Sequence, residues 1–114
     1  MAVDNLSINI EGCRYLSSSW TDTPVSLLTN ANTALQGVSN LNFDKVAAIN
    51  NRIGSFGLFV TSPTYGVTNK KYLTQAEMTD LKNSITSALL GVSNFTFAIV
   101  SISCSRNDEV MGVA

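Results

Sequence analysis

A repeated string of residues is the feature that most restricts how this chain can fold. The segment Thr33-Ala-Leu-Gln-Gly-Val-Ser-Asn-Leu-Asn-Phe43 recurs 54 residues later as Ser87-Ala-Leu-Leu-Gly-Val-Ser-Asn-Phe-Thr-Phe97, with seven of eleven positions identical. The same spacing relates Gly12 to Gly66. Self-similarity at a fixed period is the signature of a repeated structural unit. We therefore expect the chain to arise from an internal duplication.

Each copy of the string follows a predicted amphipathic helix. Glu77 lies three residues after Thr74, the spacing of a capping box, and Pro24 suits the first turn of the other helix. Gly37 and Gly91 predict the helix ends, because glycine adopts the left-handed conformation without a Cβ penalty. The apolar residues with the i, i+3, i+4, i+7 spacing of one helical face are Leu28, Ala31, Ala34, Leu35 and Val38 in the first copy, and Met78, Leu81, Ile85, Ala88, Leu89 and Val92 in the second.

Strand patterns flank both predicted helices. Residues 6–10 alternate between apolar and polar, and residues 56–61 are their counterpart before the second helix. The first exit strand begins at Leu41, whereas residues 95–104 are apolar on nearly both faces, as in a strand that is covered on both sides. Residues 50–54 contain the turn-forming types of a hairpin that joins the halves.

A strand–helix–strand unit used twice predicts an α+β fold of the ferredoxin-like split β-α-β type. Right-handed crossovers place both helices on one face of a four-stranded antiparallel sheet, with the strands in the order four, one, three, two. We expect one domain, 1–114, with pseudo-repeats at about 5–51 and 55–105 and a polar C-terminal tail at 106–114. A bare apolar edge invites pairing with another chain, so we expect residues 95–104 in a subunit or partner interface.

The residues that could carry chemistry form no catalytic or metal-binding set. The chain has no histidine, which removes the side chain most used for acid–base work at neutral pH and a common metal ligand. Cys13 and Cys104 form no CxxC motif, and we expect two buried free thiols at opposite ends of the sheet. No pair among the eight carboxylates has the spacing of a catalytic motif. We therefore expect no enzymatic activity, no cofactor and no metal site.

Charge is scarce along this chain. Charged residues make up 13%, the formal net charge is −1, and Ser, Thr and Asn account for 37 of 114 residues. A polar, nearly neutral surface permits close association with copies of the chain or with a partner.

Lys70–Lys71 is an isolated pair, whereas nucleic-acid binding needs several clustered cations. Residues 52–60 are similar to the aromatic third strand of the RNA-recognition motif, but out of step by one residue, and residues 6–10 supply no aromatic stacking partner. Binding to nucleic acid is not expected.

Aromatic residues in the two loops that lead into the helices indicate where a partner could bind. Tyr15 and Trp20 belong to the first loop, and Tyr65 and Tyr72 flank the second. Trp and Tyr dominate interface energetics, although a tryptophan here could instead cover the end of the core. The predicted contact set is completed by Phe95, Phe97 and Ile99 of the last strand.

The composition is similar to that of many phage and virus structural proteins, which share its few charges and abundant Ser, Thr and Asn. No apolar run approaches the roughly 20 residues of a membrane helix, and the first residues lack a signal-peptide pattern. We expect a non-enzymatic structural or assembly subunit, cytoplasmic or part of a virion if phage-encoded. Its expected partners are copies of itself and other structural proteins. The alternatives are an oligomeric small-ligand-binding or regulatory module and a phage-encoded inhibitor of a host protein.

Overall fold

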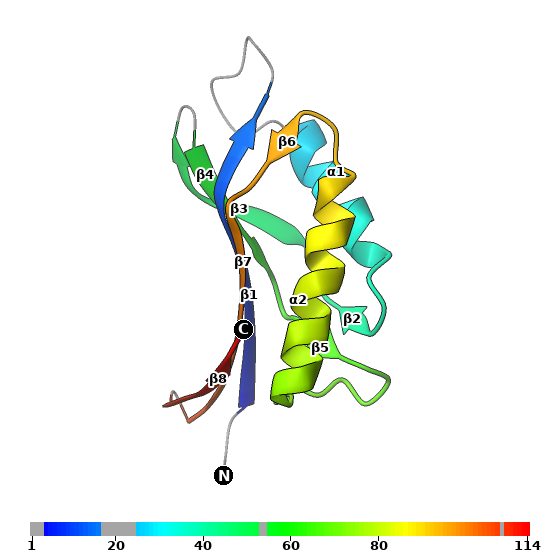
Figure 1. The fold of residues 1–114 in the computed structure, drawn as a ribbon, viewed down its shortest axis with the longest axis vertical. Coiled ribbons are helices and arrows are strands. Elements are labelled where there is room, and N and C mark those ends of the chain that lie inside the picture. The colour runs from blue at the N-terminus through cyan, green and yellow to red at the C-terminus, as the bar shows by residue number, and fades with distance from the viewer. Residues whose placement is uncertain (1–3, 17–24, 53–54, 108) are drawn as a thin grey trace.

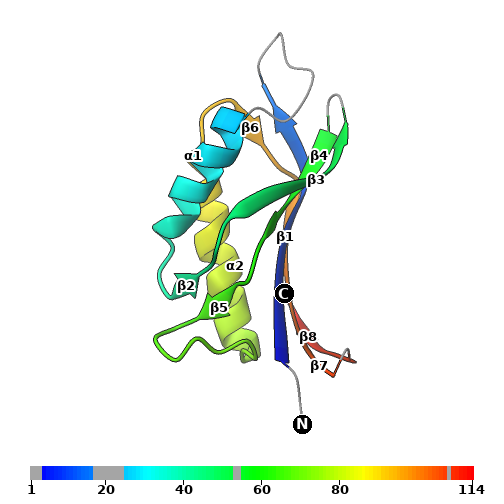
Figure 2. The same cartoon turned by 180° about the vertical axis from the view of Figure 1, so that it is seen from behind.

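An antiparallel sheet carries two helices on one of its faces (Figure 1, Figure 2). The computed structural model describes residues 4–16, 25–52, 55–107 and 109–114. The helices are α1 (Val25–Gln36) and α2 (Gln75–Leu90). The strands are β1 (Asp4–Tyr15), β2 (Leu41–Asn42), β3 (Val46–Arg52), β4 (Ser55–Val60), β5 (Thr64–Tyr65), β6 (Phe95–Thr96), β7 (Ile99–Arg106) and β8 (Glu109–Val113).

The main sheet is larger than the four-stranded sheet that the sequence predicts. Its strand order is β3-β4-β1-β7-β8, and β6 pairs with the end of β1, which makes six strands. Strands β7, β1, β4 and β3 stand in the order predicted for the fourth, first, third and second strands. The prediction of four strands is wrong because β6 and β8 join the sheet. A separate two-stranded ladder joins β2 to β5.

The C-terminal residues form a strand and not the polar tail expected at 106–114. Asn107, with φ of 54°, lies at a turn that lets β8 pair back onto β7. Ile102 and Ala114 exchange both backbone hydrogen bonds, at 2.9 and 2.7 Å. The expectation that residues 95–104 contain an uncovered edge is therefore wrong from Ile102 onward. The reason is that a left-handed asparagine permits a tight reversal there.

Both strands that leave the helices are interrupted at equivalent places. After β2, the N–H of Asp44 donates to the carbonyl of Thr61 at 3.0 Å, and after β6 the N–H of Ala98 donates to the carbonyl of Glu11 at 2.9 Å. The first exit strand thus starts as the short β2, and its main part, β3, continues to Arg52. The turn predicted over residues 50–54 is wrong for residues 50–52, which belong to β3, and residues 53–54 lie outside the described part of the chain.

A second pair of hydrogen bonds repeats in the two halves. The N–H of Gly66 donates to the carbonyl of Asn40, and the N–H of Leu16 donates to the carbonyl of Asn94, both at 2.7 Å. The acceptors are 54 residues apart, but the donors are only 50 apart. The leading strands are therefore related by 50 residues, whereas the helix ends and exit strands are related by 54.

The shorter spacing corrects one sequence match. Gly66 is the structural counterpart of Leu16, and the counterpart of Gly12 is Ser62. Gly12 and Ser62 are both left-handed, with φ of 67° and 52°. The four-residue difference equals the difference in helix length, 12 residues in α1 and 16 in α2. The added first turn of α2 carries the predicted capping box of Thr74 and Glu77, which is confirmed.

Both helices end just before the predicted glycines, Gly37 and Gly91, but the left-handed conformation expected of Gly91 is wrong. Gly91 caps α2 in a right-handed conformation, with φ of −83° and ψ of −5°. Its N–H donates to the carbonyl of Ala88 at 3.2 Å. This bond spans three residues, so the last turn of the helix is tightened and the backbone of Gly91 stays in the right-handed region. The left-handed residues are Asn40 and Asn94, with φ of 67° and 57°. The reversal thus falls on asparagine, which tolerates this conformation better than other residues with side chains.

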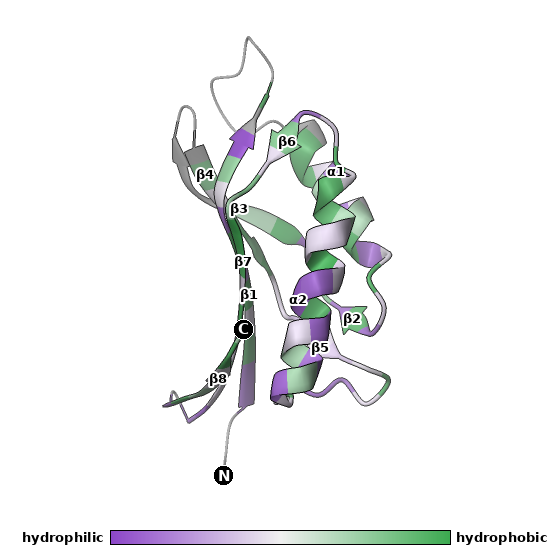
Figure 3. Ribbon diagram, viewed as in Figure 1, coloured by the Kyte–Doolittle hydropathy of each residue, from purple (hydrophilic) through white to green (hydrophobic). Residues whose placement is uncertain are grey.

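Each helix buries the face that its periodicity predicts, and hydrophobic and hydrophilic residues alternate along α2 (Figure 3). Leu28, Ala34 and Ala88 lie at the margins of these faces and are partly buried. The buried residues are Leu27, Ala31 and Leu35 of α1, Val38 after it, Met78, Leu81, Ile85 and Leu89 of α2, and Val92 after it. They pack on the apolar residues of β1, β4 and β7, which close the core from the other side.

Candidate functional site

The sheet face that points away from the helices is uncovered in the described part of the chain (Figure 2). Side chains alternate across a strand, so this face takes the residues that lie between the buried positions of each strand. Its residues, named the open face, are Asn5, Ser7, Asn9, Glu11 and Arg14 of β1, Ala47 of β3, Phe59 of β4, Ile99, Ser101, Ser103 and Ser105 of β7, and Val110 and Val113 of β8.

Small uncharged side chains form the centre of the open face. Ser7 pairs with Ser103 across β1 and β7, and Asn9 pairs with Ser101. These four side chains are half-buried, and because they are short they leave the centre of the open face nearly flat. Among the described residues, Glu11 and Arg14 are the ionisable side chains of the open face, and both lie toward the end of β1. A second surface could therefore approach closely without desolvating several charges, the largest cost of association at a charged surface.

Exposed apolar side chains are concentrated on two neighbouring strands, β7 and β8. The exposed fractions are 47% for Ile99, 62% for Val110, 51% for Met111 and 60% for Val113. The other large exposed apolar residues in the described ranges are Leu16, Val67 and Leu90, which lie outside β7 and β8. Concentrated apolar exposure is typical of a contact surface, because covering it removes apolar area from water.

The outer edge of β8 has no strand partner among the described residues. The pairing of β8 with β7 shifts by one residue between Cys104 and Ser105, which is a β-bulge, and the strand is only five residues long. Bulges and short strands reduce edge-to-edge pairing. The side chains of the open face are therefore better suited to a contact than the backbone edge of β8.

The residues predicted to contact a partner do not form one surface. Trp20 lies outside the described residues, and Tyr15 is described only through its backbone, which pairs with Phe95. Phe95 itself is buried, as is Tyr65, so both belong to the core. Among the predicted residues whose side chains the structure describes, Ile99 alone lies on the open face.

Two further predicted contact residues are held by neighbours in the same chain. Phe97 is partly buried and stacks on Phe95, with ring centroids 5.7 Å apart. Tyr72 is covered by the guanidinium of Arg106, which lies 4.6 Å from the ring centroid. Asp4 fixes that guanidinium with a bond of 2.7 Å from Arg106 Nε to Oδ1. The contacts of Phe97 and Tyr72 are therefore internal to the chain. Sequence reasoning missed the open face because it did not predict the C-terminal strand β8.

The two neighbouring lysines of the second loop have different surroundings. Lys70 forms an ion pair with Glu77 and lies 5.6 Å from the ring centroid of Tyr65. The hydrogen bond from Lys70, with that from the backbone of Thr74, holds the pKa of Glu77 below its ordinary value. Lys71 has no ion-pair partner among the described residues. Lys70 thus fixes the start of α2, and Lys71 remains available to a ligand.

Both cysteines are buried thiols, as predicted, at opposite ends of β1. Cys13 is opposite Phe56, and Cys104 is opposite Leu6. Burial raises the pKa of the Cys13 thiol to about 12, which suppresses the nucleophilic thiolate at neutral pH. Cys104 Sγ accepts the backbone N–H of Leu73 at 3.3 Å, so it fastens the segment before α2 to the sheet.

The described residues offer no metal centre, because no three His, Cys, Asp or Glu side chains gather among them. No helix in the described ranges is long and apolar enough to cross a membrane. Comparisons of the chain with protein-family models, with curated proteins and with solved structures found no match.

Proposed function

We propose that this protein is a non-enzymatic structural or assembly subunit that associates with copies of itself through the open face. The observation that carries the proposal is a sheet face with rows of serine and asparagine, two ionisable residues near one end and flanking exposed valines. Small side chains allow two such faces to approach closely, and the valines supply apolar area. A face that packs on its own copy about a twofold axis forms a closed, isologous contact.

The scarcity of charge supports the same proposal. With a formal net charge of −1 and 13% charged residues, copies of the chain repel one another little at long range. The setting we propose is a particle with many subunits, such as a phage or virus particle, in which each subunit is surrounded by copies and by other structural proteins.

We also propose that the fold is a ferredoxin-like duplication to which a C-terminal strand has been added. Three observations support this: the strand order β7-β1-β4-β3, the two helices on one face, and the backbone hydrogen bonds repeated in both halves. In this description β8 is the addition, because no strand corresponding to it lies beyond β3 in the described sheet.

Sedimentation velocity over a concentration series tests the self-association. We expect the wild-type protein to form dimers or larger species and Ser103→Arg to be monomeric, because a charge at the centre of the open face would be buried without a partner. Thr79→Arg, on the exposed face of α2, is the matched control and should behave as the wild type. Circular dichroism checks that both variants fold. A wild-type protein that stays monomeric up to about 1 mM, a Kd worth only about 4 kcal/mol, would reject the proposal.

A second pair of variants tests the contribution of the valines. Val113→Asp should weaken the association about tenfold, the loss expected for removing one buried valine. Val67→Asp places the same charge on a side chain that is 99% exposed and lies outside the sheet, so it should leave the association unchanged. Equal effects of the two substitutions would point to net charge and not to the open face.

A further inference from the structure

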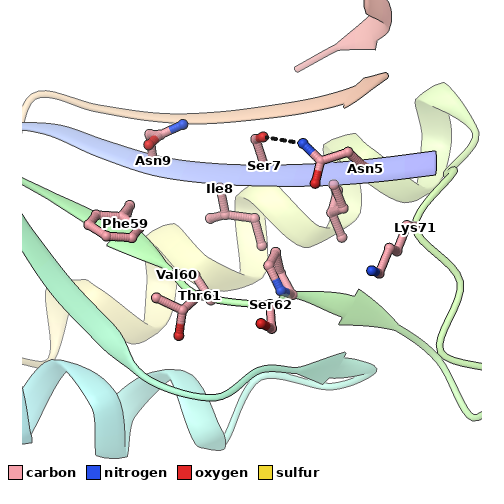
Figure 4. A pocket seen from close by; sticks show the side chains of 11 residues that line it. Asn5, Ser7, Ile8, Asn9, Phe59, Val60, Thr61, Ser62 and Lys71 are labelled. Atoms are coloured by element: carbon pink, nitrogen blue, oxygen red, sulfur yellow. Dashed lines mark hydrogen bonds between the residues drawn. The ribbon is translucent and has the colours of Figure 1, made fainter. Parts of the chain in front are cut away.

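The pairing between β1 and β4 stops short of the start of β1. The last pair in that direction is Asn9 with Phe59, so the residues of β1 that precede Asn9 have no β4 partner. A notch of about 420 Å³ opens there (Figure 4). Its lining residues are Asn5, Leu6, Ser7, Ile8 and Asn9 on one side, Phe59, Val60, Thr61, Ser62 and Pro63 on the other, and Lys71.

A proline accounts for the missing partner of Leu6. At the other end of the same strand pair, Cys13 pairs with Phe56. The 50-residue relation between the leading strands makes Pro63 the counterpart of Cys13 and Leu6 the counterpart of Phe56. Proline has no backbone N–H, so the hydrogen bonds that close one end cannot be repeated at the other.

The backbone of Leu6 is directed into the notch. Ile102 exchanges hydrogen bonds with Ala114, so its N–H and C=O point toward β8. Successive residues of a strand alternate in direction, and β1 pairs with β7 without interruption, so Ser7 bonds to Ser103 whereas Leu6 points away from β7. No described residue supplies a partner on the other side for the N–H and C=O of Leu6.

The notch is lined by one charged residue, the cation Lys71. Figure 4 shows the Lys71 side chain directed toward the gap between β1 and the segment that follows Val60. No acidic residue lines the notch, and Lys71 has no ion-pair partner in the described part of the chain. The notch therefore combines an unpaired strand edge with a single unpaired cation.

We propose that the notch binds an extended segment of a separate polypeptide, which adds to β1 as a strand and places an acidic group at Lys71. In this β-augmentation the N–H of Leu6 donates to a peptide carbonyl and the C=O of Leu6 accepts a peptide N–H. Residues 4–8 extend over about 16 Å at roughly 3.3 Å per residue, so the bound segment has about five residues. A second copy is a poor source, because every strand of its described main sheet, the edge strands β3 and β8 included, is paired on at least one side and would have to leave that sheet to enter the notch. The notch adjoins the open face and shares the side chains of Asn5, Ser7, Asn9 and Phe59 with it, but Ser103 and Val113 do not line the notch.

Nuclear magnetic resonance titration with defined probes tests the proposal. The probes are six acetylated and amidated hexapeptides of alternating Val and Thr, with Asp replacing each position in turn. At about 2 mM, matched to the weak affinity expected of a short segment, at least one probe should shift the amide signals of Leu6 and Ile8. If none of the six shifts these signals, the proposal is wrong.

Modified probes and variants then check how the segment binds. Methylating the peptide nitrogen that faces Leu6 should weaken binding about tenfold, and methylating the next nitrogen, which faces away, should not. Lys71→Gln should weaken binding about threefold, whereas Lys82→Gln, on α2 away from the notch, should have no effect. Equal effects within either pair would overturn strand addition at this edge.

Hydrogen exchange of the free protein is an independent check. The amide of Leu6 should exchange about 100-fold faster than that of Ser7, because only Ser7 is bonded across the sheet. Equal protection would show that the edge is closed and would contradict the proposal. Repeating the titration with Ser103→Arg separates the two proposals, since peptide binding should survive loss of self-association.

Discussion

The two ends of the β1–β4 pair are related by the 50-residue spacing of the leading strands, but only one of them is closed by strand pairing. At one end Cys13 meets Phe56, and at the other end Pro63 stands where the scheme requires a donor for Leu6. The first end is closed into the core, and the second is open as a notch. The missing backbone N–H of Pro63 thus leaves Leu6 without the partner that Phe56 has, while the left-handed residues Gly12 and Ser62 keep the same place at both ends.

The outer strands of the two halves differ as well. Strand β3 pairs with β4 alone and stands at an edge of the sheet, whereas β7 pairs with β1 on one side and with β8 on the other. The helix of the second half is also longer by one capped turn. The shared parts are the buried helix faces and the hydrogen bonds that join each leading strand to its exit strand. The differences lie at the boundaries of the sheet, where a change of sequence does not disturb the core.

The strongest test of the similarity of the two halves is a pair of core truncations. Leu35 and Leu89 occupy matching places in α1 and α2 and are both 0% exposed. Leu35→Ala and Leu89→Ala should each lower the free energy of unfolding by about 3 kcal/mol, through lost burial and a residual cavity. Urea denaturation measures both. Leu90→Ala, at a residue 73% exposed, is the control and should have little effect. Costs that differ by more than about 2 kcal/mol would show that the helices are not packed equivalently.

Two glycine substitutions separate backbone strain from steric clash. A Cβ on Gly12 would come within 2.5 Å of the Cβ of Ala98, and Gly12 is also left-handed. We expect Gly12→Ala to lower the free energy of unfolding by about 2–3 kcal/mol. Gly66 is left-handed, but a Cβ there meets no atom within 4 Å, so Gly66→Ala should cost only about 1 kcal/mol. Chemical denaturation of the two variants gives the difference, and equal losses would refute the clash with Ala98.

The added turn of α2 can be weakened without touching the core. Thr74 Oγ1 accepts the N–H of Glu77 at 3.2 Å, and Glu77 Oε1 accepts the N–H of Thr74 at 3.0 Å. Thr74→Ala should lower the free energy of unfolding by about 1 kcal/mol, because an orphan N–H of the first turn loses its acceptor. Thr79→Ala, on the exposed face of the same helix, controls for the loss of a threonine. Equal thermal stabilities of the two variants would mean that the capping box contributes nothing.

The smallest effect concerns the ion pair that joins the start of β1 to the end of β7. The hydrogen bond from Arg106 holds the pKa of Asp4 below its ordinary value. A lowered folded-state pKa stabilises the protein above the unfolded-state pKa of about 4, and this stabilisation is lost as the pH falls through the folded-state value. Asp4→Asn should therefore flatten the dependence of thermal stability on pH below about pH 5. The exposed pair is screened by salt, so an unchanged pH profile in Asp4→Asn at low ionic strength would contradict its role.

Several features of this fold follow from local sequence alone. The buried faces of α1 and α2 and the capping box of Thr74 and Glu77 were predictable, because helical periodicity and capping depend on residues within one or two turns. The burial of Cys13 and Cys104 follows from the apolar strands that contain them. The central strand order also follows, since short links and right-handed crossovers leave few topologies for a repeated strand–helix–strand unit.

Other features depend on which segments meet in the folded chain. Val110, Met111 and Val113 are too few and too irregular to predict a strand on their own, and β8 forms because β7 offers it an edge. The left-handed residues are Asn40 and Asn94, because the last helical turn tightens and Gly37 and Gly91 still take part in its hydrogen bonds. The periodic parts, which are two amphipathic helices, apolar strands and a repeat, are encoded locally and can be recognised without the fold. Tertiary structure alone decided the open face and the notch, because each requires knowing which backbone groups and faces are left without a partner once distant strands have paired.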